Sequence, residues 1–193
     1  MWLDMLKIIK SPKLPLFLIT IILFVIPFFW LKPNEMDLGG DESRLFFYDP
    51  LNFIYSNGLF FKEMITLGNR AFDPYFDYLP FVFILLLIKS VVNSPYFLIS
   101  LLNGIKVSIS FLSIYLIIKI ILQTSYKEKR EILIQIPSLV GGLLYTTAPI
   151  VIGNYDKALL SHDQIFLNPL CFYFILNYFI KEKFRYLLAF ITV

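Results

Sequence analysis

Apolar residues in this chain fall into long runs separated by short polar segments. Four of the runs are close to the ~20 residues that a helix needs to cross the hydrocarbon of a bilayer, at 14–31, 103–123, 132–152 and 165–180. A fifth apolar segment begins at 186 and reaches the last residue, 193, with no polar tail. The pattern predicts an all-α fold, a polytopic membrane helix bundle, and indicates the front part of a longer membrane protein.

The segment 32–78 is too polar to cross a membrane and forms the predicted outer loop. Acidic residues outnumber basic ones there. Apolar residues nevertheless recur at helical spacing between Leu45 and Leu67, including Leu51, Ile54 and Phe60. This periodicity predicts amphipathic helices that lie along the membrane surface.

The short apolar segment 79–93 allows two topologies. If it crosses the membrane, the next run crosses back, and Lys127, Lys129 and Arg130 end up outside, against the positive-inside tendency. If it is an interfacial or re-entrant helix, 103–123 is the second span and those charges lie inside. We expect the second arrangement, since Pro80 opens the segment and Lys89 stands near its end.

Composition strengthens the membrane interpretation. The 193 residues are 58% hydrophobic and 16% charged, and the mean hydropathy is +0.73, well above that of a soluble domain. The net charge of +3 is too small to favour a nucleic-acid partner. Lys7, Lys10 and Lys13 precede the first span and predict a cytoplasmic amino end, with the plasma membrane as the expected location.

The polar stretch Asp41-Glu42-Ser43-Arg44 follows the first span closely. We call it the acidic motif. Adjacent carboxylates and a guanidinium beside a membrane can accept a proton and bind a lipid-borne anion. The alternative is structural, because Asp41 and Glu42 would also stabilise the amino end of a helix that starts at Ser43.

The order of these features resembles that of the C-type superfamily of membrane glycosyltransferases, which includes protein mannosyltransferases and aminoarabinose transferases. Asp41-Glu42-Ser43-Arg44-Leu45-Phe46 is similar to an Asp-Glu-x-Arg-aromatic pattern in their first outer loop. Leu79-Pro80, Gly104–Ser108, Ala148-Pro149 and Ser161–Gln164 stand where those enzymes have an interfacial helix, a basic residue in a span, a proline turn and an outer acid. The chain departs from the pattern in having one proline at 80 in place of a pair.

The resemblance implies transfer of a sugar from a polyprenyl-phosphate donor at the outer face of the membrane. Asp41 would be the catalytic base or a metal ligand, with Glu42 as the second candidate. Arg44, Lys106 and His162 are the substrate-binding candidates, the two cations for the donor phosphate. A carboxylate at Asp163, brought toward Asp41, would provide oxygen ligands for a divalent cation, the expected cofactor.

A second class of function stays open at this point. The chain could be a non-enzymatic polytopic membrane protein, either transporter-like or an inactive fragment. An ionisable residue within a span, Lys106, is also typical of transporters. The acidic outer loop and the absence of paired broken helices favour the glycosyltransferase.

Overall fold

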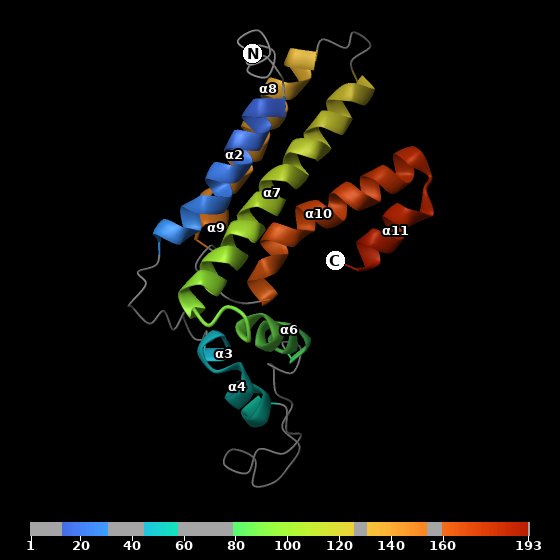
Figure 1. The fold of residues 1–193 in the computed structure, drawn as a ribbon. Helices are drawn as coiled ribbons and strands as arrows, with labels where there is room; N and C mark the ends of the chain where they lie inside the picture. The colour runs from blue at the N-terminus through green and yellow to red at the C-terminus, as the bar shows by residue number, and fades with distance from the viewer. Residues whose placement is uncertain (1–12, 31–44, 58–78, 126–130, 154–159, 193) are drawn as a thin grey trace, which may run out of the picture.

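The computed structural model describes residues 13–30, 45–57, 79–125, 131–153 and 160–192. All regular structure within these ranges is helical, as the sequence predicts, and no strand occurs in them. Three helices, α2 (Lys13–Val25), α7 (Pro95–Ser125) and α8 (Glu131–Thr146), lie side by side, with α7 in contact with both others (Figure 1).

The central element is α7, whose 31 residues extend about 46 Å at 1.5 Å per residue. In the described part of the chain it is the one helix that is long and apolar enough to cross a bilayer. It also contacts α10 (Leu160–Lys181), which begins beside it and leans away toward its carboxyl end (Figure 1). Shorter apolar helices at Lys13–Phe29, Glu131–Thr146 and Ile165–Lys181 thus surround α7.

Glycines set the distance between α7 and its neighbours. A Cβ on Gly104 of α7 would stand 2.4 Å from the carbonyl oxygen of Phe24 on α2. A Cβ on Gly142 of α8 would stand 2.8 Å from the ring of Phe111 on α7. Only hydrogen fits at either contact, so the backbones approach as closely as they do in helix pairs packed within membranes.

Hydroxyl groups on these helices bond mainly to their own backbone. Thr20, Ser113, Ser138 and Thr146 each donate to the carbonyl four residues earlier, at 2.6–3.0 Å. One longer contact joins two helices, from Ser108 Oγ on α7 to the carbonyl of Thr20 on α2 at 3.4 Å. Most of these side chains therefore satisfy their hydrogen-bonding groups without a partner helix.

Large apolar side chains cover much of the outer surface of the bundle. The exposed residues include Phe17, Leu18, Ile21 and Ile22 on α2; Ile132, Leu133, Ile136, Val140 and Leu144 on α8; and Phe172, Phe179 and Ile180 on α10. They lie on successive turns of several helices. An apolar surface of this extent is unlike that of a soluble monomer, where exposed apolar patches are small.

Short helices gather at the amino end of α7. A 3₁₀ turn, η1 (Ile26–Phe29), continues α2, while α3 (Leu45–Tyr48), α4 (Pro50–Asn57) and α6 (Leu79–Lys89) lie at or below the start of α7 (Figure 1). α6 has 11 residues, about 16 Å of helix. It occupies part of the segment for which the sequence allows two topologies.

The boundaries differ from the predicted spans in several places; α10, for example, begins at Leu160 and not at 165. Two of the differences are explained by proline. α7 begins at Pro95, well before Asn103, because proline has no N–H to lose in the first turn of a helix. The predicted span 132–152 is divided, since α8 ends at Thr146 and the separate turn α9 (Pro149–Ile152) follows. Pro149 disfavours the α conformation in the residue before it, and Ala148 is extended with ψ 138°.

The last helix, α11 (Phe184–Ile191), turns back from the end of α10. Lys181 and Arg185 donate hydrogen bonds to the hydroxyl of Tyr186, at 3.3 and 3.4 Å. These side chains and Lys183 are exposed. The turn between α10 and α11 is consequently a strongly basic, solvent-accessible corner.

The glycine contacts predict a difference between two matched variants. Alanine gains up to about 1 kcal/mol over glycine in a helix at either site. At Gly104 the new methyl meets backbone, and such overpacking costs about 1–3 kcal/mol. At Gly141 it meets only the terminal Cδ1 of Ile118, which can rotate away.

We therefore expect Gly104→Ala to lower the thermal unfolding midpoint in detergent and Gly141→Ala to leave it unchanged or higher. Equal midpoints for the two variants would contradict the close α2–α7 contact.

Candidate functional site

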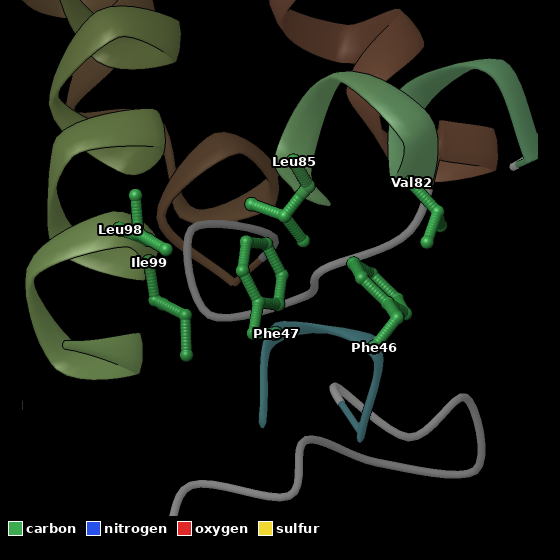
Figure 2. Packing of buried hydrophobic residues seen from close by; sticks show 6 residues of the cluster. All are labelled: Phe46, Phe47, Val82, Leu85, Leu98 and Ile99. Atoms are coloured by element: carbon green, nitrogen blue, oxygen red, sulfur yellow. The ribbon is translucent and has the colours of Figure 1, made fainter. Parts of the chain in front are cut away.

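The acidic motif precedes α3 directly, but Asp41, Glu42 and Arg44 lie outside the described residues. What the structure shows is how the chain is held immediately after them. Phe46 and Phe47 are 3% and 4% exposed. They pack against Val82 and Leu85 of α6 and Leu98 and Ile99 of α7, a set that we call the amino-end cluster (Figure 2).

Aromatic rings and one hydrogen bond fix this arrangement. The rings of Phe46 and Phe47 stand 6.0 and 6.2 Å from that of Phe81, both edge to face. Lys89 Nζ, at the end of α6, donates to the carbonyl oxygen of Tyr48 at the end of α3. The residues that follow the acidic motif are thus joined to α6 at both ends of α3.

The end of the first long helix is tied to the same region. The hydroxyl of Tyr96, in the first turn of α7, donates to the carbonyl oxygen of Phe28 in η1. The rings of Phe28 and Phe97 meet edge to face at 5.6 Å. The end of η1 and the start of α3 therefore both lie beside the first turns of α7.

Lys106 lies on α7, about 10 Å along the axis from Ile99. Its side chain is half-buried, between exposed Ile105 and buried Val107. Val107 belongs to a second group of buried side chains, which we call the mid-bundle cluster and which contains Leu23, Val107, Phe111, Val151 and Phe166.

His162 and Asp163 belong to the first turn of α10, and only their backbone is described. The next turn is well fixed, because Phe166 is 1% exposed in the mid-bundle cluster. The carbonyl of Ile165 also accepts a 2.7 Å hydrogen bond from the hydroxyl of Tyr145 on α8. The start of α10 is thereby packed into the buried cluster that also contains Val107, the residue after Lys106.

The structure thus shows that Val107, next to Lys106, and Phe166, three residues after Asp163, belong to one buried cluster. It does not position Asp41, Glu42 or Arg44, and in the ranges that it describes no three His, Cys, Asp or Glu side chains gather as a metal site would require. The side chains of the predicted cation ligands Asp41 and Asp163 lie outside the described structure.

Two features of the structure are not predicted from the sequence. The first is a series of buried polar residues along α7, at Ser100, Asn103, Ser108, Ser110 and Ser113. Ser100 Oγ and Ser110 Oγ have no hydrogen-bond partner within the described structure. Small polar residues repeated at helical spacing inside an apolar run are the available sequence signal.

The second is a cavity of about 420 Å³ at the carboxyl end of α7. It is lined by Lys119 and Gln123 of α7 and by Glu131, Ile134 and Gln135 of α8. The sequence indicates this cavity only through two polar residues, four positions apart, on each of two adjacent helices. This pattern becomes informative only when the two helices are known to pack together.

Comparisons with known protein families, with curated protein sequences and with solved structures find no match to this chain.

Proposed function

We propose that the chain is an integral membrane helix bundle that presents the acidic motif to a lipid-linked sugar at the outer membrane surface. Support for the membrane part comes from the exposed apolar side chains on α2, α8 and α10 around a helix of spanning length. In lipid such a surface carries no penalty, and glycine contacts rather than hydrophobic burial hold the helices together.

Charge supports the orientation. α7 and α10 run in one direction and α2 and α8 in the other (Figure 1). Three helix ends that adjoin basic segments of the sequence lie opposite the amino-end cluster: the start of α2, the end of α7 with the start of α8, and the α10–α11 corner. By the positive-inside tendency this end is cytoplasmic and the acidic motif is outside.

The proposed outer location of α6 follows from its size. Its 11 residues extend about 16 Å, roughly half of the ~30 Å hydrocarbon thickness. Both of its ends then stay on the outer side, in the amino-end cluster. α6 would lie in the membrane interface, as we expect from Pro80 and Lys89.

One observation carries the catalytic part of the proposal: segments distant in sequence converge on the first half of α7. The amino-end cluster holds the residues just after the acidic motif, and the mid-bundle cluster holds the start of α10 beside Val107. Asp41 is four residues before Leu45 in the sequence, and four residues of extended chain span at most about 14 Å. Asp41, Lys106 and Asp163 can then share one polar site.

The chemistry follows from those residue types. The Asp41 carboxylate accepts the proton of an acceptor hydroxyl. At the same time, the oxygen of that hydroxyl bonds to the anomeric carbon of the sugar. The bond from that carbon to the phosphate oxygen breaks, and polyprenyl phosphate leaves with the electron pair. Lys106 and Arg44 stabilise the charge on the leaving phosphate.

The topology predicts the sides from which introduced cysteines react. In a Cys171→Ser background, cysteine at Ser43 or Ser94 should be labelled from outside by a membrane-impermeant thiol reagent, and cysteine at Ser125 only after the membrane is permeabilised. Ser94 and Ser125 flank or end α7 and are exposed. Labelling of both from the same side would show that α7 does not cross.

The catalytic proposal predicts that Asp41→Asn abolishes sugar transfer, because the amide keeps the shape and removes the base. Membranes containing the full-length protein would be supplied with a panel of radiolabelled polyprenyl-phosphate monosaccharides, and label in the acceptor fraction measured. Asp49→Asn is the matched control. Asp49 accepts the N–H of Asn52 at 3.0 Å, a bond that an asparagine oxygen also makes. Unchanged transfer by Asp41→Asn would favour the non-enzymatic alternative.

Anchoring of the acidic motif predicts an effect from a residue that touches no substrate. Phe47→Ala removes a buried ring from the amino-end cluster, a change that costs about 3–5 kcal/mol in protein cores. We expect transfer to fall at least tenfold while protein levels in the membrane stay constant. Tyr55→Ala, on α4 and 65% exposed, is the control. Equal activity of the two variants would show that the cluster does not position the motif.

A further inference from the structure

The cavity at the carboxyl end of α7 lies at the opposite end of the bundle from the acidic motif. Lys119 and Gln123 are four residues apart on α7, and Glu131 and Gln135 are four residues apart on α8. Residues at this spacing share one face of a helix. Because α7 and α8 pack against each other, these two polar faces border the same space, with buried Ile134 between them.

The lining combines buried and exposed polar side chains. Gln135 is only 9% exposed, Lys119 is half-buried, and Gln123 and Glu131 are exposed. Lys119 Nζ stands 5.7 Å from the ring of Tyr115, a cation–π contact. A ligand that supplies hydrogen-bonding groups can pair with these side chains inside the cavity.

The depth of the cavity points to a lipid headgroup. If α7 is centred on the bilayer, its length of about 46 Å exceeds the ~30 Å hydrocarbon by about 8 Å on each side. Lys119 is six residues, about 9 Å, from the end of α7. It therefore lies at the boundary between hydrocarbon and headgroups on the cytoplasmic side, where pockets between helices bind lipid phosphates.

The charges of the lining side chains restrict which headgroups can bind in the cavity. Among the described residues of the lining there are one ammonium and one carboxylate, so a purely anionic headgroup would meet repulsion from Glu131. A headgroup with a phosphodiester and a primary ammonium complements both, the phosphate at Lys119 and the ammonium at Glu131, with the two glutamines bonding to both ends. The cavity volume of about 420 Å³ is in the range of small-molecule sites.

We propose that this cavity binds a phosphoethanolamine group, held by Lys119, Gln123, Glu131 and Gln135. The proposal rests on the proposed insertion of α7 but not on sugar transfer, and the thiol labelling of Ser94 and Ser125 tests that insertion separately. The source of the group is either a phosphatidylethanolamine of the cytoplasmic leaflet or a soluble glycerophosphoethanolamine.

The test is lipid binding to the protein purified in mild detergent, followed by native mass spectrometry. Phosphatidylethanolamine, phosphatidylcholine and phosphatidylglycerol with the same acyl chains would be titrated separately. Choline lacks the N–H donors and glycerol lacks the positive charge. We expect phosphatidylethanolamine to bind about tenfold more tightly than either, a difference of about 1.4 kcal/mol.

Variants then assign the selectivity to the cavity. Lys119→Gln and Glu131→Gln should each reduce phosphatidylethanolamine binding to the level of phosphatidylcholine. Lys183→Gln and Glu182→Gln remove the same charges from the exposed α10–α11 corner and should change nothing. Gln135→Leu, which keeps the approximate volume, provides a third cavity variant should a charge variant fail to insert.

Competition with glycerophosphoethanolamine distinguishes the two sources. Displacement of the lipid by the soluble compound at comparable concentration would identify the free headgroup as a sufficient ligand, and its failure to displace would identify the lipid, both in agreement with the proposed chemistry. Equal binding of the three lipids by the unaltered protein, or equal losses in the cavity and control variants, would overturn the proposal.

Discussion

The contact of α7 with α2 at Gly104 and with α8 at Gly142 is the constraint on which the rest of the structure depends. Both contacts allow only a hydrogen atom, so they fix how near the helices stand and at what register. α10 then packs on α7 through Phe166, and the short helices pack on its first turns through Phe46 and Phe47. If α7 were separated from α2, the 3₁₀ turn that ends the first long helix would no longer meet Tyr96, and η1 would lose its position beside the first turn of α7.

The helical nature of the fold follows from the sequence, since long apolar runs leave a chain few other structures. The boundaries of the helices follow from the sequence less well. Hydropathy places the start of the second span at 103 because Ser100 and Asn103 interrupt the apolar run, whereas in the structure both are buried against neighbouring elements and the helix simply continues from Pro95. Conversely, Ala148-Pro149 lies within an apolar run, and the backbone restriction before proline ends α8 all the same.

For the candidate site, too, the sequence predicts some features and not others. Residue type and spacing identify groups that can do chemistry, such as Lys106 and the acidic motif, because charge beside apolar sequence is costly and visible. They do not identify which groups meet. Lys119 is an ionisable residue in the same apolar helix as Lys106, and nothing in its local sequence distinguishes it. Its significance comes from α8, across a helix contact that is set by Gly142 and Phe111, residues without any functional chemistry.

The hydroxyl groups that bond within their own helices have a consequence for how the protein is made. Thr20, Ser113, Ser138 and Thr146 each satisfy their donor inside a single helix. A helix of this kind can enter lipid by itself without exposing these hydroxyl donors, and it needs no partner at that moment. If the helices insert as we propose, the choice of partner then depends on shape, because one glycine must meet one carbonyl or one ring.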